Sequence, residues 1–140
     1  MIKNRNIFLL AILFTSFFLI RAAEASEKII DGTYILSEQK TLLANMDADP
    51  GVKTLIKMFA QGGYQVVISG ENVTISAMGK TAPTVSATSK MEHGIQSLVF
   101  KFNNADIEIG PLAEKNQIYL IEKNNLTIHF PKVIMISCKS

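Results

Sequence analysis

Two periodicities divide this chain. From residue 64 to residue 138, apolar and polar residues mostly alternate, which is the pattern of half-buried β-strands. Between residues 37 and 61 the apolar residues instead recur at every third or fourth position, which is typical of amphipathic helices. The chain is therefore predicted to be mainly β, with a short helix pair near its start.

The strands are predicted to follow one another along an antiparallel meander. A first strand is expected at residues 29–36, and its inner face would carry Ile30, Gly32, Tyr34 and Leu36. The later strands are expected at residues 64–69, 72–78, 84–91, 95–102, 106–109, 117–122, 126–130 and 132–138. Asn and Gly, which tolerate the backbone of tight turns, separate many of these segments. Such short connections favour antiparallel pairing.

The helical segment contains start and stop signals for two helices. Ser37 is a good N-cap for the first helix, and Asp49-Pro50 places an N-cap and a first-turn proline at the start of the second. Gly62-Gly63 is typical of a helix C-terminus. The second helix has one apolar stripe, formed by Val52, Leu55, Ile56 and Phe59. This stripe is expected to pack on the sheet.

A meander of about eight strands with one apolar face closes into a barrel or folds over as a sandwich. Alternation is the same in both arrangements, so the pattern leaves both open. An eight-stranded barrel holds either a packed core or one small ligand.

The first 25 residues have the order of a secretory signal peptide. Lys3 and Arg5 precede an apolar run at residues 7–20, and small residues lie before the expected cut after Ala25. The run is shorter than the roughly 20 residues of a spanning helix. We therefore expect a secreted or periplasmic domain of residues 26–140, with no membrane span after cleavage.

The charge balance of that domain argues against nucleic acid as a partner. It contains 11 Lys, 11 acidic residues and no Arg, whereas phosphate binding requires clustered cations. Its single cysteine, Cys138, is expected to be a small buried residue on the last strand. A disulfide between two chains is the alternative, and the oligomeric state stays open. The sequons at Asn72 and Asn125 matter only if the host glycosylates.

No motif of catalysis stands out, so we expect a protein that is not an enzyme and has no cofactor. The two histidines, His93 and His129, lack the further ligands of a zinc site. Neither a Gly-x-Ser-x-Gly elbow nor a phosphate-binding loop is present. Asp106 and Glu108 share one strand face and could form a glycosidase-type acid pair, but we favour the simpler explanation that they lie on the solvent side of a half-buried strand.

The order of elements resembles the calycin-type barrels, that is, the lipocalins and the fatty-acid-binding proteins. Gly32-Thr33-Tyr34 looks like their Gly-x-Trp signature, with Tyr in place of Trp, and residues 66–76 look like their second and third strands. The helix pair after the first strand is similar to the lid of the fatty-acid-binding proteins. The chain most nearly resembles bacterial secreted lipocalin-like proteins. The Arg-x-Tyr pair that holds a ligand carboxylate in those families has no counterpart in residues 136–140.

This resemblance implies a small hydrophobic ligand inside the barrel, beneath the helices. Alternation and the helical stripe predict which residues line the ligand site. They are Tyr34, Leu36, Leu55, Phe59, Leu98, Phe100, Phe102, Leu126, Ile128 and Phe130. Tyr34 would supply the polar contact. We therefore expect an exported, non-enzymatic ligand-binding protein. The alternative is an exported protein-interaction module, such as an inhibitor or envelope accessory protein, in which the same residues form a packed core.

Overall fold

A computed structural model describes residues 27–123 and 131–138. Within them the elements are β1 (Gly32–Leu36), α2 (Glu38–Ala44), α3 (Pro50–Gln61), β2 (Gln65–Ser69), β3 (Asn72–Ala77), β4 (Lys80–Thr81), β5 (Val85–Ser86), β6 (Thr88–Glu92), β7 (Ile95–Phe102), β8 (Ala105–Pro111), β9 (Gln117–Glu122) and β10 (Val133–Ser137). The mainly β meander with a helix pair after its first strand is confirmed. The predicted signal peptide and the predicted strand at residues 126–130 lie outside the described residues.

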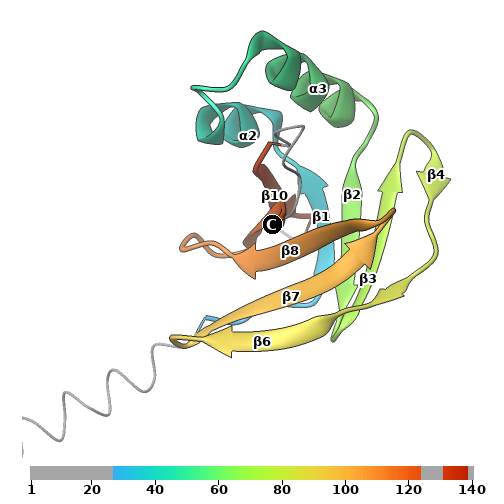
Figure 1. The fold of residues 1–140 in the computed structure, drawn as a ribbon, viewed down its shortest axis with the longest axis vertical. Coiled ribbons are helices and arrows are strands. Elements are labelled where there is room, and N and C mark those ends of the chain that lie inside the picture. Colours follow the sequence, from blue (N-terminus) through green and yellow to red (C-terminus); the bar gives the residue numbers. More distant parts are fainter. Residues whose placement is uncertain (1–26, 124–130, 139–140) are drawn as a thin grey trace, which may run out of the picture.

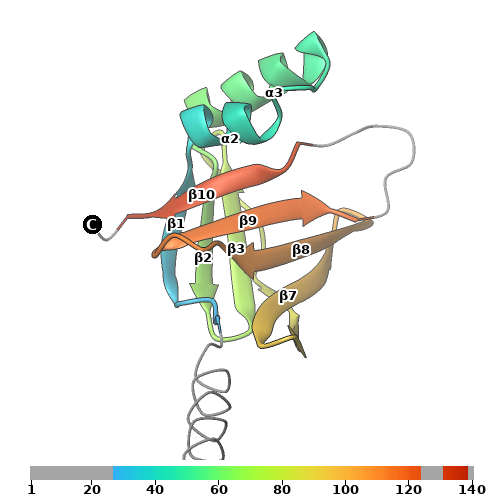
Figure 2. The ribbon, with the colours of Figure 1, turned by 90° about the vertical axis from the view of Figure 1, so that its left-hand side faces the viewer.

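All strand pairs are antiparallel, and they form one sheet in the order β4-β3-β2-β1-β10-β9-β8-β7-β6. The sheet folds over on itself. Strands β6, β7 and β8 cross in front of β1, β2 and β3 in Figure 1, and β8, β9 and β10 cross them in Figure 2. The core lies between these two crossed layers, and the helix pair lies over one end of them.

The described strands do not close into the barrel that was one of the two expected arrangements. The segment predicted as a single strand at residues 84–91 divides at Ala87. Before it, Val85 pairs with Val73 of β3, and after it, Thr88 pairs with Val99 of β7. The segment around Ala87 therefore links the β3 side of the sheet to the β7 side through the covalent chain. A closed barrel would instead have a continuous ladder of hydrogen bonds at this place.

The core is one cluster of inward-facing residues from both layers. Its buried members are Tyr34, Val66, Ile68, Val73, Ile75, Ala87, Leu98, Phe100, Ile107, Ile109, Ile118, Leu120, Val133 and Met135. The alternation predicted for residues 95–102 is confirmed, since Leu98 and Phe100 are buried and Phe102 packs against the cluster. Asn103 and Asn104 turn the chain into β8 with positive φ angles of 50° and 65°, as expected for a tight hairpin.

The helix signals in the sequence are confirmed at both ends. The Ser37 side chain accepts a hydrogen bond from the Lys40 amide, and α3 begins at Pro50 after its N-cap Asp49. After α3, Gly63 adopts a φ of 73°, which favours glycine. None of the helices among the described residues is long and apolar enough to cross a membrane.

The side chains of Thr41 in α2 and of Asn45, the C-cap of this helix, form hydrogen bonds with β10 and with the residue before it, beyond the point where β1 ends. The Thr41 hydroxyl donates to the Ile134 carbonyl at 3.2 Å and accepts from the Ile134 amide at 3.0 Å. The Asn45 amide group donates to the Lys132 carbonyl at 2.9 Å and accepts from the Lys132 amide at 3.1 Å. Because Thr41 and Asn45 are four residues apart, they lie on one helix face. Helix α2 thus acts as the missing neighbour of this part of β10.

Two expectations about the chain ends are wrong. The first strand begins at Gly32 rather than at residue 29, and Ile30 is 59% exposed. Cys138 is exposed rather than buried. It follows the end of β10, where its backbone amide still donates to the Thr33 carbonyl, but alternation no longer directs its side chain inward.

Candidate functional site

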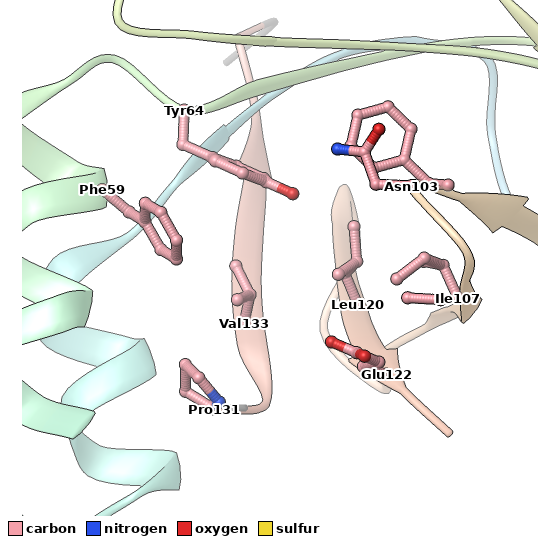
Figure 3. Close-up of a pocket in the computed structure, with 10 residues that line it drawn as sticks. Phe59, Tyr64, Asn103, Ile107, Leu120, Glu122, Pro131 and Val133 are labelled. Carbon is pink, nitrogen blue, oxygen red and sulfur yellow. The ribbon is translucent and has the colours of Figure 1, made fainter. Parts of the chain in front are cut away.

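A pocket of about 450 Å³ opens between α3 and the strands beneath it (Figure 3). It is bounded by the end of α3, the start of β2, the β7–β8 hairpin, the end of β9 and the start of β10. Its lining residues are Phe59, Tyr64, Phe102, Asn103, Ala105, Ile107, Leu120, Glu122, Pro131 and Val133. Most of this surface is apolar, which is typical of sites for small molecules.

The strand register brings the sheet side of the pocket onto one face. Phe102 pairs with Ala105 across the β7–β8 hairpin, and Ile107 of β8 pairs with Glu122 of β9. Because directly paired residues point to the same side of a sheet, Glu122 faces inward together with Ile107.

The helix side of the pocket is formed by two aromatic rings. The ring centroids of Phe59 and Tyr64 are 5.4 Å apart, with planes inclined at 44°. The backbone of Tyr64 is fixed from both directions, because its amide donates to the Phe59 carbonyl and its carbonyl accepts from the Leu36 amide. The position of the Tyr64 ring is therefore determined by the junction of α3, β1 and β2.

The Tyr64 hydroxyl points into the pocket (Figure 3). Burial raises the pKa of Tyr64 to about 12, so the hydroxyl is neutral near pH 7. It has no hydrogen-bond partner among residues 27–123 and 131–138. The other two tyrosines differ: the Tyr34 hydroxyl donates to the Ile30 carbonyl, and the Tyr119 hydroxyl donates to the Glu108 carboxylate. A ligand that reached Tyr64 would find a hydroxyl ready to donate and accept.

Glu122 is an acidic residue in an inward-facing position. The preceding inward residues of β9, Ile118 and Leu120, are both buried in the core. In Figure 3 the Glu122 carboxylate lies below Leu120 and Ile107, at the end of the pocket away from Tyr64 and Asn103. The described lining residues include no Lys, Arg or His, so this side chain determines the charge of the described lining.

The residues predicted from the sequence to line a ligand site lie in three different environments. Phe59 and Phe102 line the pocket. Tyr34, Leu98 and Phe100 are buried in the core and Leu36 packs against it, while Leu55 is half-buried on α3. Leu126, Ile128 and Phe130 lie outside the described residues.

Tyr34, which was predicted to supply the polar contact to a ligand, borders a different hollow of about 450 Å³. This second hollow lies beside the chain before β1 and the β8–β9 loop, and it is also lined by Ile29, Ala113 and Gln117. The Tyr34 hydroxyl already donates to the Ile30 carbonyl. Its hydrogen bond is therefore used within the fold.

Sequence reasoning missed Tyr64 and Glu122, the two lining residues on which the chemistry of the pocket depends. The inward position of Glu122 could have been predicted, because alternation places it on the same face as Leu120. No sequence pattern indicates the position of Tyr64, since it lies in the connection between α3 and β2.

The acid pair Asp106 and Glu108 lies on the outer face of β8, away from the pocket. The Glu108 carboxylate forms an ion pair of 2.9 Å with Lys123 and raises the pKa of that lysine. The described residues contain no group of three or more His, Cys, Asp or Glu placed to hold a metal ion.

Comparisons of the chain with protein-family models, with curated proteins and with solved structures give no significant match. The structure supports the coarser part of the calycin resemblance, namely an antiparallel β fold with a short helix pair after its first strand. The function is therefore argued from the pocket.

Proposed function

We propose that this protein is an exported, lipocalin-like carrier that holds one small apolar molecule between α3 and the sheet, without catalysing a reaction on it. The observation that carries the proposal is an apolar pocket of about 450 Å³ into which the Tyr64 hydroxyl points, with no hydrogen-bond partner among the described residues. Ligand pockets have roughly 300–1,000 Å³, mostly apolar walls and a few directed polar groups.

The Tyr64 hydroxyl gives this apolar pocket one directed polar group, as sites for small molecules have. A ligand that reaches it can accept or donate one hydrogen bond there. Asn103 adds a second polar side chain to the same pocket. The site thus suits an apolar molecule with a hydrogen-bonding group at one end.

Export is part of the proposal because the first 25 residues have the order of a signal peptide. The test is the denatured mass of the chain recovered from the exported fraction. A mass corresponding to residues 26–140 supports cleavage after Ala25, and the full-length mass contradicts it.

The binding test uses the neutral apolar dye N-phenyl-1-naphthylamine, whose fluorescence rises in apolar surroundings. Ala105 lines the pocket, whereas Ala113 lines the second hollow. The variants Ala105→Leu and Ala113→Leu therefore add the same side chain to one cavity each.

We expect the unmodified protein and Ala113→Leu to bind the dye equally, and Ala105→Leu to bind it about tenfold more weakly, a loss of roughly 1.4 kcal/mol. The absence of dye binding by the unmodified protein would overturn the proposal. A loss in Ala113→Leu with no loss in Ala105→Leu would place the ligand in the second hollow instead.

A second candidate function is an interaction module, and one observation favours it. The outer face of the helix pair has a shallow groove with Leu42, Leu43 and Met46, beside Lys53 and Lys57. Leu43 and Met46 are 60% and 64% exposed. The partner that fits this groove is a protein segment with apolar side chains, which contact the apolar groove, and acidic side chains, which face the two lysines. If the protein is an interaction module, Leu43→Ser should abolish partner binding. If the protein is a carrier, the same substitution should leave dye binding unchanged.

A further inference from the structure

Resting on the proposed function, we infer that the ligand presents a neutral hydrogen-bond acceptor, the carbonyl oxygen of a ketone, ester or amide, to the Tyr64 hydroxyl. The inference goes beyond ligand binding because it names the polar group of the ligand and the residue that recognises it. It follows from the direction of this hydroxyl, from the amide group of Asn103 at the same end of the pocket and from the apolar surroundings.

The Tyr64 hydroxyl is held in a defined place and is available to a ligand. Its backbone is fixed by hydrogen bonds to Phe59 and Leu36, and its ring centroid lies 5.4 Å from that of Phe59. The hydroxyl points into the pocket (Figure 3), and none of the described residues forms a hydrogen bond with it. Because a phenol hydroxyl rotates about its bond to the ring, its proton can be directed at an acceptor inside the pocket.

Asn103 supplies further donors at the same end of the pocket (Figure 3). It lies at the tip of the β7–β8 hairpin, where Phe102 pairs with Ala105 and where its own φ is 50°. Its side-chain amide carries two N–H donors, and the Tyr64 hydroxyl carries one. A carbonyl oxygen has two lone pairs, so one ligand carbonyl can accept from both residues.

The surroundings of the Tyr64 hydroxyl favour a neutral acceptor over a carboxylate. Burial raises the pKa of Tyr64 to about 12, because a negative charge on this oxygen loses its hydration. A ligand carboxylate that accepted from Tyr64 would lie in the same apolar surroundings and would lose hydration in the same way. A carbonyl accepts the same hydrogen bond without a charge, so its loss of hydration is smaller.

The apolar part of the ligand has its place on the strand side of the pocket. Ile107, Leu120 and Val133 line the pocket there and belong to the buried core cluster. An alkyl chain in contact with these side chains is removed from water, which favours binding. The carbonyl would thus lie between the Tyr64 and Asn103 side chains, and the chain would extend from it towards the strands.

The experiment measures how three ligands with the same heptyl chain displace N-phenyl-1-naphthylamine from the processed protein. Heptyl methyl ketone carries the neutral acceptor, octanoate carries the anion, and heptyl chloride lacks a strong acceptor. The measurement is repeated with Tyr64→Phe, which removes only the hydroxyl. The matched control is Tyr119→Phe, because the Tyr119 hydroxyl donates to Glu108 and lies outside the pocket lining. Each displacement is converted to a dissociation constant with the dye affinity of the same variant.

A second pair of variants tests the other donor. Asn103→Gly removes the amide group in the lining, and Asn104→Gly removes the amide group of the neighbouring residue, which is not part of the lining. Both positions have positive φ angles, which glycine adopts without strain. The two variants therefore differ in the pocket and not in the backbone conformation that they require.

We expect Tyr64→Phe to weaken the binding of heptyl methyl ketone about fivefold, as the loss of one hydrogen bond implies, and that of heptyl chloride less than about twofold. Asn103→Gly should weaken the ketone about threefold, because Asn103 is more exposed than Tyr64. Tyr119→Phe and Asn104→Gly should change neither ligand. For the unmodified protein near neutral pH, octanoate should bind at least about tenfold more weakly than the ketone.

An unchanged affinity for the ketone in Tyr64→Phe, or a loss of equal size for the ketone and the chloride, would overturn the inference. Tighter binding of octanoate than of the ketone would also overturn it. If Tyr64→Phe does not fold, the comparison of Asn103→Gly with Asn104→Gly and the ratio between ketone and octanoate decide. A failure of the dye itself to bind would instead overturn the proposed function, so the two failures are distinguishable.

Discussion

The two helices cover the same end of the sheet but are attached to it in different ways (Figure 2). Helix α2 is connected to β10 by hydrogen bonds from Thr41 and Asn45 to the strand backbone. Helix α3 borders the pocket with Phe59, whose ring contacts the Tyr64 ring. The side chains that attach α2 form directional hydrogen bonds, whereas the Phe59 side chain makes an apolar contact without a fixed direction.

This difference explains why the pocket lies beneath α3. A helix bound through buried hydrogen bonds cannot move without leaving polar groups unsatisfied. A wall formed by ring contacts can adjust around a ligand and lose only part of its contact area. In this fold the side chains of α2 hold the strand backbone by hydrogen bonds, and Phe59 of α3 supplies an apolar wall of the pocket.

The strongest test of this comparison is Thr41→Val. The substitution keeps the shape but removes both hydrogen bonds to Ile134, so the buried Ile134 amide loses its partner, whereas the Ile134 carbonyl keeps the Ser37 amide at 2.9 Å. We expect the free energy of unfolding to fall by about 1–3 kcal/mol in urea titrations followed by circular dichroism. Thr41→Ser keeps the hydroxyl and should cost only about 1 kcal/mol for the lost methyl group. Equal losses in the two variants would contradict the role of the hydrogen bonds.

Phe59→Ala tests the other helix. It removes one ring of the contact with Tyr64 and one wall of the pocket. Since Phe59 is half-buried, we expect a stability loss of about 1–2 kcal/mol, below the 3–5 kcal/mol of a fully buried Phe. Dye binding should weaken, and Phe59→Leu should retain more of both properties. A stability loss larger than that of Thr41→Val would reverse the comparison between the helices.

Asn45→Ala sharpens the comparison within α2. Asn45 makes two hydrogen bonds to Lys132, but in exposed surroundings where water replaces them. We therefore expect a loss of only about 1 kcal/mol. Hydrogen exchange at the Lys132 amide should accelerate, because that amide donates to the Asn45 side chain. Unchanged exchange at Lys132 would show that the contact does not protect the strand.

Tyr64→Phe is expected to have the smallest effect at neutral pH, within about 0.5 kcal/mol, because no hydrogen bond within the described chain is lost. Its effect appears in alkali. Burial raises the pKa of Tyr64 from 10.0 to about 12, so the folded chain holds this proton more tightly than the unfolded chain. The resulting stability is complete below pH 10 and is lost as the pH rises from 10 to about 12.

Unfolding measured at about pH 9 and about pH 11 should therefore show a smaller decrease for Tyr64→Phe than for the unmodified protein. Tyr34 and Tyr119, whose pKa values burial also raises, are retained in both proteins and serve as the internal reference. An identical decrease would show that Tyr64 is not buried in solution.

Sequence reasoning succeeded where the determining interactions are local. The N-cap at Ser37 and the positive φ of Gly63 depend on a few neighbouring residues, so the sequence indicated both helix ends. Phe59 and Phe102 were predicted on inward-facing positions, and both border the pocket, because the face of a helix or strand follows from its own period.

The missed features depend on contacts between distant segments. Alternation states which face a residue occupies but not which strand lies beside it, so the change of partner at Ala87 was not predicted. In the same way, Glu122 was not among the residues predicted to line the site, although alternation places it on the same face as Leu120. Only the assembled sheet shows that this face borders a pocket.

The open sheet has a consequence for how copies of this chain meet. Outer strands with free backbone groups invite other chains to pair with them and so promote aggregation. Here β4 is only two residues long, Lys80–Thr81, and β6 carries the exposed side chains of Lys90 and Glu92. A short strand offers little to pair with, and charges oppose close approach. Both features oppose pairing between the outer strands of neighbouring copies of this chain.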